Sequence, residues 1–104
     1  MEAPPLSIAI VMPVFNEEAV LPKTFRRLVG LFDQNPAYQW RSILVDDGSK
    51  DTSSSLLEDQ QINDPRFEII TLTRNFGFQS ALAAGIDAAA DADVVITMDA
   101  DLQD

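Results

Sequence analysis

The sequence predicts an α/β protein in which helices cover both faces of a parallel β-sheet. Three observations lead to this fold class. Four short apolar runs alternate along the chain with three segments whose apolar residues recur at helical spacing. The resulting order is β-α-β-α-β-α-β, and such alternation favours parallel strands joined by helical crossovers. The runs are also continuously apolar, as expected of strands that are buried on both faces.

The first half of the chain is expected to form two strands and one helix. Residues 8–12 are a continuous apolar run closed by Pro13, which predicts a buried strand. Residues 16–18, Asn-Glu-Glu, combine a capping residue with acids suited to a helix N-terminus. That helix is expected to end at residues 35–36, Asn-Pro, and a second buried strand follows at residues 42–45. The apolar residues at helical spacing are Leu21, Phe25, Leu28 and Phe32.

The second half continues the alternation. A short helix is expected from about Thr52 to a turn at residues 63–65, Asn-Asp-Pro. Residues 67–73 and 94–98 predict the third and fourth strands, and a third helix lies between them, with small residues that allow close approach to the sheet. The apolar residues that define these two helices are Leu56, Leu57, Leu82, Ile86 and Ala89, and the first two are expected to face inward.

The composition excludes several kinds of site. The 104-residue chain has seventeen acidic and seven basic residues, a formal net charge of −10, and no basic stripe of the kind that binds nucleic acid. It lacks cysteine and histidine, which excludes disulfides, thiolate metal sites and histidine bases. An acidic protein that handles phosphates needs local positive charge, and a bound cation is one source. Since the start of the chain is acidic and its apolar runs are too short to span a bilayer, we expect a cytoplasmic location.

Polar residues gather where each expected strand ends. The four clusters lie at residues 16–17, 46–47, 74–75 and 99–101. In open parallel sheets, ligands bind outside the carboxyl ends of the strands, near the point where the strand order reverses. If the four strands are parallel, the clusters meet at one edge of the sheet, and we expect a binding site there.

The segment Asp99-Ala100-Asp101 is the strongest candidate for binding a metal ion. Alternate residues of an extended segment point to the same side, about 6–7 Å apart along the backbone, so two carboxylates can lean onto one hard cation. Mg²⁺ prefers a few carboxylates, with water and phosphate oxygens in the remaining positions, and Mn²⁺ favours similar ligands. Gln103 is the next residue expected on the same side of the extended segment, and its side-chain carbonyl can add a further oxygen ligand. The alternative interpretation of this segment is an acidic surface turn.

The other clusters have structural interpretations beside functional ones. Asp46 and Asp47 open the segment Asp-Asp-Gly-Ser, which suits a plain turn, but a carboxylate there could also accept a hydrogen bond from a base or a ribose. Helix capping alone explains Asn16-Glu17. Arg74 is the only cation in the four clusters, and it is either a solvated residue or a contact to a base carbonyl or phosphate. The rings of Phe76 and Phe78 are expected to pack rather than to stack on a ligand.

Taken in order, four segments resemble the family 2 glycosyltransferases of the GT-A fold. They are residues 11–18 (VMPVFNEE), 44–51 (LVDDGSKD), 72–77 (LTRNFG) and 98–104 (MDADLQD), and their order and spacing match through almost the whole chain. They look most like the branch that transfers hexoses to dolichyl or other polyprenyl phosphates. No two of the glycines fit a Gly-x-Gly-x-x-Gly motif, so metal-assisted diphosphate binding is the nucleotide-binding scheme that fits best.

The resemblance implies roles for the residues at the strand ends. Pro13, Phe15 and Glu17 would line the nucleotide pocket, and Asp46 or Asp47 would recognise the base together with Arg74. Asp99 and Asp101 would hold Mg²⁺ or Mn²⁺ and the ribose–diphosphate of a UDP- or GDP-linked sugar, with Gln103 as a further metal ligand. Asp101 would act in catalysis through the metal, which neutralises charge growing on the departing nucleoside diphosphate.

The resemblance also implies an inverting reaction and an acceptor. The expected acceptor is a polyprenyl phosphate or another glycosyl acceptor, bound by a further half of the protein. A phosphate monoester has a second pKa of about 6, so it is largely anionic at neutral pH and needs less help from a general base than a sugar hydroxyl does.

The resemblance further predicts how the chain is organised. Residues 1–104 would be the donor-binding half, with the sheet in the order 3-2-1-4, while the acceptor-binding half of family members lies beyond Asp104. We therefore expect this chain alone to bind nucleotide and metal weakly or not at all, and to transfer sugar poorly if at all. The full-length parent is expected to lie at the cytoplasmic face of a membrane. The strand at residues 94–98 would lie at an exposed edge, which invites a homo-oligomer.

Two other classes of protein share parts of this pattern. A signalling receiver domain also has an Asp-Asp pair after a strand, but it needs a phospho-accepting Asp after its third strand and a Lys after its fifth, whereas the third strand here leads to Arg74. A nucleotidyltransferase would carry a glycine-rich basic loop after its first strand, and residues 13–17 are neither glycine-rich nor basic.

Overall fold

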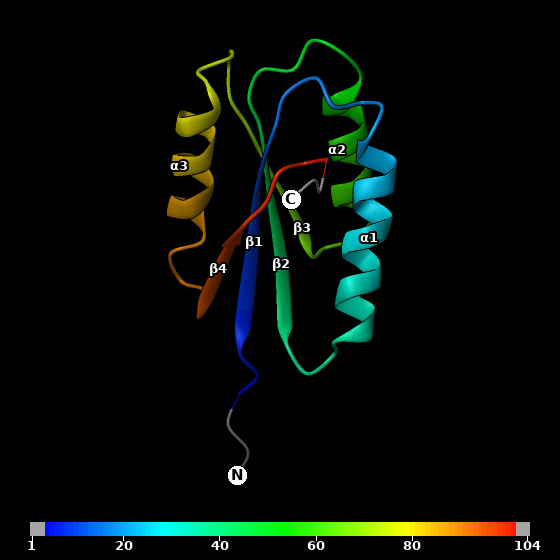
Figure 1. Ribbon diagram of the computed structural model, residues 1–104, viewed down its shortest axis with the longest axis vertical. Helices are drawn as coiled ribbons and strands as arrows, with labels where there is room; N and C mark the ends of the chain where they lie inside the picture. The colour runs from blue at the N-terminus through cyan, green and yellow to red at the C-terminus, as the bar shows by residue number, and fades with distance from the viewer. Residues whose placement is uncertain (1–3, 102–104) are drawn as a thin grey trace.

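The apolar runs build a four-stranded parallel sheet, and helices cover both of its faces (Figure 1). The computed structural model describes residues 4–101. The strands pair in the order β3-β2-β1-β4, and all three pairings are parallel. This order confirms the expected arrangement 3-2-1-4, and it differs from that of receiver-like sheets, in which β1 lies between β2 and β3. The strands are β1 (Ser7–Val14), β2 (Gln39–Asp46), β3 (Phe67–Thr71) and β4 (Val94–Thr97).

The two faces of the sheet carry different helices. Figure 1 shows α1 (Leu21–Gln34) and α2 (Ser53–Asn63) on one face and α3 (Phe78–Ala88) on the other. Because alternate residues of a strand point to opposite faces, β1 contributes to both cores. The larger core, under α1 and α2, includes Ile10, Met12, Phe25, Phe32, Leu57 and Phe67. The smaller core, under α3, is made of Ala9, Val11, Ile43, Val45, Ala81 and Ala89.

Helix α3 lies close to the sheet, and its inward face is made of small residues. Gly85 is buried on this face, and a Cβ added there would lie 2.3 Å from Cγ1 of Val11. The expectation of a close approach is therefore confirmed. Ile86 instead points outward and is 43% exposed, although it helped to define the helix in the sequence.

Helix α1 begins later than the capping pattern predicted. Its first residue is Leu21, the residue in the N-cap position is Val20, and no side chain caps the helix. The interpretation of Asn16-Glu17 as a helix cap is therefore wrong, and these residues lie in the loop before the helix. The predicted end of the helix is correct, since Asn35 is the C-cap residue.

Strand β4 forms one edge of the sheet. It pairs with β1 alone among the described strands, and the side chains of Val94, Val95 and Ile96 are 36% to 38% exposed. The expected exposed edge is therefore confirmed. Within residues 4–101, no helix has the length and apolar character needed to cross a membrane.

Candidate functional site

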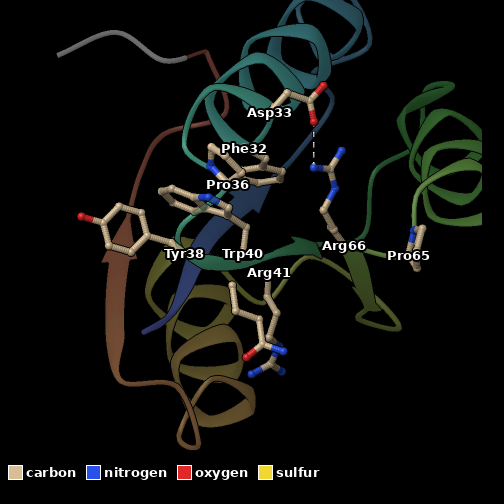
Figure 2. A pocket seen from close by; sticks show the side chains of 9 residues that line it. Phe32, Asp33, Pro36, Tyr38, Trp40, Arg41, Pro65 and Arg66 are labelled. Atoms are coloured by element: carbon tan, nitrogen blue, oxygen red, sulfur yellow. Dashed lines mark hydrogen bonds and ion pairs between the residues drawn. The ribbon is translucent and has the colours of Figure 1, made fainter. Parts of the chain in front are cut away.

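The molecule is hollowed at both ends of the sheet, and the smaller hollow is lined by most of the residues that the sequence predicted for the site. At the carboxyl ends of the strands lies a pocket of about 320 Å³. A hollow of about 650 Å³ lies at the opposite, amino end, between the end of α1 and the start of β2 (Figure 2). The described residues that line the carboxyl-end pocket are Pro13, Val14, Phe15, Glu17, Asp47, Asn75, Gly77, Phe78, Asp99, Ala100 and Asp101.

The structure brings together most of the residues singled out in the sequence. Six of the predicted site residues line this pocket: Pro13, Phe15, Glu17, Asp47, Asp99 and Asp101. They come from the ends of β1, β2 and β4, and the loop after β3 completes the wall. Asp46 and Arg74 do not line the pocket. Gln103 lies outside the described residues.

Pro13 helps to open the pocket because of where it sits in the sheet. The pairing of β1 with β4 ends at Val11 and Thr97, where the N–H of Met98 donates to the carbonyl of Val11 at 3.0 Å. Two residues later the backbone of Pro13 faces the same side, and proline has no N–H to offer there. On the other side β1 continues to pair with β2 as far as Val14. Strands β1 and β4 can therefore diverge at this point without leaving a strand N–H unpaired, and the pocket opens between them.

Asp47 anchors the loop that follows β3. Its side chain is almost fully buried, and Oδ1 accepts a hydrogen bond from the N–H of Phe76 at 2.8 Å, while Oδ2 accepts one from the N–H of Gly77 at 3.1 Å. The side-chain amide of Asn75 adds a bond of 3.3 Å to Oδ2. A carboxylate has about four acceptor positions, so Asp47 retains capacity for a ligand while it holds this wall of the pocket.

Asp46 is enclosed by the turn that follows its own strand. It is 1% exposed, and its carboxylate accepts hydrogen bonds from the N–H of Ser49, at 3.0 Å, and from the hydroxyl of Ser54. Adjacent residues at a strand end point to opposite faces. Of the two adjacent acids, Asp47 therefore faces the pocket and Asp46 completes the turn.

Gly48 joins two walls of the pocket. It adopts a φ of +75°, and a Cβ there would lie 2.4 Å from the carbonyl carbon of Arg74 and 2.5 Å from the nitrogen of Asn75. Only a residue without a side chain allows the β2 loop to pack this closely on the β3 loop. The Arg74 guanidinium lies 4.5 Å from the centre of the Phe76 ring, and both residues are exposed.

Five lining residues were not among the predicted site residues: Val14, Asn75, Gly77, Phe78 and Ala100. Asn75 was part of a named cluster, but its role as a partner of Asp47 depends on a fold that brings two loops together. The rings of Phe76 and Phe78 are 46% and 56% exposed, and Phe78 lines the pocket, so its interpretation as a packing residue rather than a ligand contact stays a prediction. The aromatic pair around Gly77 was the only signal for Phe78 in the sequence.

The pocket is acidic. No lysine or arginine is among the described residues that line it. Partial burial, together with the neighbouring charges of Asp101, Asp51 and Asp99, raises the pKa of Glu17 above its usual value. Negative charge therefore accumulates at this edge of the sheet, and a bound cation would offset it.

The oxygen atoms present fit a hard divalent cation, but the described residues do not enclose one. Asp99 and Asp101 are exposed at the rim, on either side of the buried Ala100, whose carbonyl accepts a hydrogen bond from Thr24. Within residues 4–101, no group of three or more acidic side chains surrounds a single metal position. Mg²⁺ and Mn²⁺ accept such incomplete protein sites, since water and phosphate oxygens fill the other positions.

Comparison with known proteins gives a consistent result. The family model described as "Glycosyl transferase family 2" matches residues 9–104. A "Prophage bactoprenol glucosyl transferase homolog" of Escherichia coli is 39% identical over 95% of this chain and 32% of its own length. An "Undecaprenyl-phosphate 4-deoxy-4-formamido-L-arabinose transferase" of Pseudomonas fluorescens is 45% identical over 92% of this chain and 28% of its own length. The chain thus spans about a third of the length of these relatives.

A solved structure shares the fold. The mannosyltransferase of Pyrobaculum calidifontis, in complex with GDP-Man and Mn²⁺, superposes with a TM-score of 0.77 over 90% of this chain and 27% of that protein, at 19% identity.

Proposed function

The chain belongs to glycosyl transferase family 2, and from this premise we propose that its carboxyl-end pocket binds the nucleoside diphosphate of a sugar donor. The observation that carries the proposal is the convergence of six predicted residues, from three strand ends, on one pocket of about 320 Å³. Such a position, outside the carboxyl ends of parallel strands, is where α/β sheets bind their ligands.

Asp99 and Asp101 are the proposed ligands of a divalent cation, Mg²⁺ or Mn²⁺. The accumulation of acidic charge around Glu17 supports this assignment, and so does the presence of Mn²⁺ with GDP-Man in the mannosyltransferase of similar fold. When bound, the cation would offset charge on the departing nucleoside diphosphate. Asp101 would act in catalysis through this role, and Gln103 is proposed as a further ligand.

Asp47 is our candidate for recognition of the base. It lines the pocket with acceptor capacity to spare, whereas Asp46 is enclosed by the turn after β2. Pro13, Phe15 and Glu17 would form the opposite wall of the nucleotide site. Arg74 lies on Phe76, outside the lining, so its contact with a base or phosphate would require the guanidinium to turn inward.

The proposed reaction is an inverting transfer of a hexose from a UDP- or GDP-linked donor to a polyprenyl phosphate. An oxygen of the acceptor phosphate attacks the anomeric carbon, and the bond from that carbon to the diphosphate oxygen breaks, so the electron pair leaves with the nucleoside diphosphate. The names of the relatives, which include bactoprenol and undecaprenyl phosphate, support this acceptor.

The organisation of the protein follows from the same proposal. Residues 1–104 would supply the donor-binding half, and other parts of a longer protein would bind the acceptor. Because a polyprenyl phosphate is a membrane lipid, the full-length parent would lie at the cytoplasmic face of a membrane.

We also propose that the exposed strand β4 pairs with a second copy of the chain. A strand at a sheet edge carries unpaired backbone groups, and three apolar side chains of β4 are more than a third exposed. Light scattering at high protein concentration tests this, since a monomeric mass would overturn it.

Calorimetric titration tests the proposed donor site. The chain is titrated with UDP and with GDP, each in the presence and absence of Mn²⁺. We expect one nucleotide to bind weakly, and only in the presence of the metal. Binding of neither nucleotide by the folded chain, with circular dichroism as the check on folding, would contradict the proposal.

A further inference from the structure

Two loops at the carboxyl end are joined by a reciprocal set of hydrogen bonds, which we call the loop clasp. It links residues 16–18, after β1, to residues 49–53, after β2. Three consecutive backbone N–H groups of the first loop each donate to a side-chain oxygen of the second. The bonds run from Asn16 to Oγ of Ser49 at 2.9 Å, from Glu17 to Oγ of Ser53 at 2.9 Å, and from Glu18 to Oδ2 of Asp51 at 3.2 Å.

The second loop returns bonds of the same kind. The N–H of Lys50 donates to Oδ1 of Asn16 at 2.8 Å, and the N–H of Thr52 donates to Oε2 of Glu18 at 3.2 Å. The hydroxyl of Thr52 also donates to Glu18. Ser53 is fully buried, so its contact with the N–H of Glu17 is shielded from competing water.

The clasp residues of the first loop alternate with residues that line the pocket. The side chains of Asn16 and Glu18 are bound to the second loop, whereas Phe15 and Glu17, which alternate with them, line the pocket. Asn16 holds a φ of 52°, the only positive φ of a residue other than glycine in the part of the chain that the structure describes. Asparagine tolerates this left-handed conformation better than most residues do.

We propose that Asn16 and Ser53 are positioning residues for the donor site. Neither lines the pocket, but together they fix the direction in which Glu17 and Phe15 project into it. This inference rests on the proposed function, because it assigns the clasp a role in nucleotide affinity rather than in stability alone. It also accounts for the Asn-Glu-Glu segment, which is not a helix cap.

Two variants separate the contributions of the clasp. Asn16→Gly retains access to the positive φ but removes the acceptor for the N–H of Lys50. Ser53→Ala removes the acceptor for the N–H of Glu17. We expect each variant to bind the preferred nucleotide, UDP or GDP with Mn²⁺, about tenfold more weakly than the wild type, since one buried or preorganised hydrogen bond is lost. Amide hydrogen exchange at Glu17 should become faster in both.

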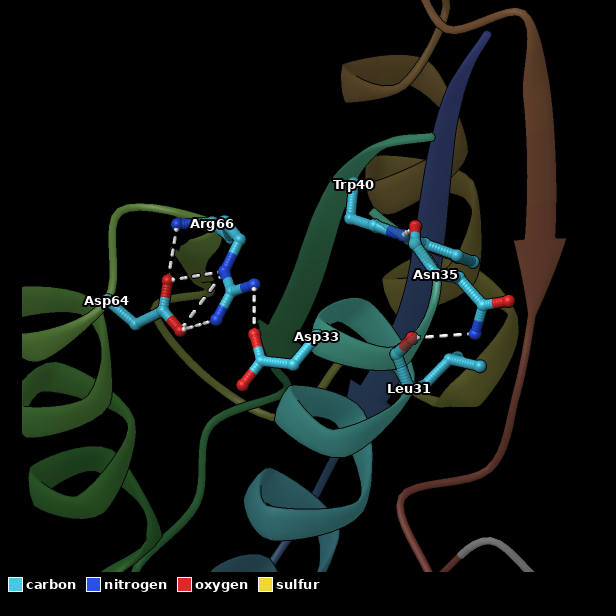
Figure 3. A network of polar contacts seen from close by, with 6 residues as sticks. All are labelled: Leu31, Asp33, Asn35, Trp40, Asp64 and Arg66. Atoms are coloured by element: carbon cyan, nitrogen blue, oxygen red, sulfur yellow. Dashed lines mark hydrogen bonds and ion pairs between the residues drawn. The ribbon is translucent and has the colours of Figure 1, made fainter. Parts of the chain in front are cut away.

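Asn35→Ala is the matched control. Asn35 lies at the far end of α1, where its side-chain amide donates to the carbonyl of Leu31 at 2.9 Å (Figure 3). This substitution also removes one hydrogen bond of an asparagine. We therefore expect Asn35→Ala and the two clasp variants to lower the Tm by a similar amount, a few degrees. It should leave both nucleotide affinity and exchange at Glu17 unchanged.

The outcomes separate this inference from the proposed function. If the wild type binds and the clasp variants bind equally well, the positioning role is overturned while the donor site stands. The same holds if Asn35→Ala weakens binding as much as the clasp variants do, because the effect would then follow stability. If the folded wild type binds neither nucleotide, the proposed function fails, and this inference fails with it.

Discussion

The two ends of the sheet differ in how their charges are balanced. At the amino end, Arg41 contacts Glu68 and Asp91, and Arg66 contacts Asp64 and Asp33, at distances from 2.6 to 3.0 Å. Each cation is therefore matched by carboxylates of the protein itself, as Figure 3 shows for Arg66. At the carboxyl end the described lining of the pocket contains acids and no lysine or arginine.

This difference shows that the size of a hollow does not identify the site. The amino-end hollow is the larger, but its aromatic side chains pack on one another, with Trp40 stacked on Phe32 at 5.2 Å between ring centres (Figure 2). Its charged residues, Arg41, Arg66 and Asp33, already have ion-pair partners within the protein. In the smaller carboxyl-end pocket the pKa of Glu17 is raised, mainly by partial burial and further by the neighbouring acidic charges. A cation and the diphosphate it binds would complete that balance.

The largest expected effect is the loss of nucleotide affinity when the two acidic residues at the rim of the pocket are removed. The double variant Asp99→Ala/Asp101→Ala should weaken Mn²⁺-dependent nucleotide binding about a hundredfold or more, because two charged ligands are lost at once. Calorimetric titration measures this. Asp33→Ala, at the amino end, removes a carboxylate from a compensated cluster and should leave the affinity unchanged. Equal losses in the two proteins would show that the rim has no special role.

The next largest effect is on stability at the junction of two loops. Gly48→Ala should lower the free energy of unfolding by about 3 kcal/mol, since the added methyl would meet backbone atoms at 2.4–2.5 Å and a positive φ is disfavoured for alanine. Denaturant unfolding measures the change. The control is Gly30→Ala in α1, where no atom lies within 4 Å of the added Cβ, and it should stabilise the protein by about 0.5–1 kcal/mol. A Gly48→Ala protein as stable as the wild type would contradict the close packing of these loops.

A smaller effect is expected at the amino end. Arg66→Ala should cost about 1 kcal/mol, because the side chain is a third exposed and solvent weakens its ion pairs, although its contact with the Phe32 ring is also lost. Nucleotide affinity should not change. If the affinity fell with the stability, the functional separation of the two ends would be wrong.

The smallest effect appears in the pH dependence. Hydrogen bonds from Arg66 hold the pKa of Asp64 below its usual 3.8, so its stabilising contribution is present above pH 3.8 and is lost as the pH falls through the lowered pKa. Burial and acidic neighbours raise the pKa of Glu17 above 4.5. Its contribution has the opposite sign: ionised Glu17 costs stability, and that cost disappears as the pH falls through the raised pKa towards 4.5.

Carboxyl-carbon NMR titration can follow both groups in one experiment. We expect Glu17 to titrate above its usual midpoint and Asp64 below its own. Added Mg²⁺ should lower the midpoint of Glu17 and leave that of Asp64 unchanged, since a cation at the rim would offset the repulsion. A common shift of both groups would indicate non-specific screening by salt.

The sequence predicted the fold class and the edge of the sheet at which the polar clusters meet. Continuous apolar runs and helical spacing predicted each element, and the four polar clusters predicted the edge of the sheet at which residues would meet. The strand order came from the family resemblance, because a set of parallel strands does not by itself specify which strands are neighbours.

The individual contacts were beyond the sequence because they depend on pairs of loops that are distant in the chain. The segment Asn16-Glu17 fits a helix cap equally well until the loop after β2 is placed beside it. Asp46 and Asp47 are indistinguishable as neighbours in the sequence. Only the direction in which each side chain leaves the sheet separates the acid of the turn from the acid of the pocket.

The most direct test of the central claim is paramagnetic broadening of the amide NMR spectrum by Mn²⁺ in the presence of the preferred nucleotide. A site at the carboxyl end predicts strong broadening of Glu17, Asp47, Ala100 and Asp101, with Tyr38 and Trp40 at the amino end unaffected. Mg²⁺ with the same nucleotide is the diamagnetic control. Broadening centred on the amino end, or none near Asp99 and Asp101, would contradict the assignment of the donor site.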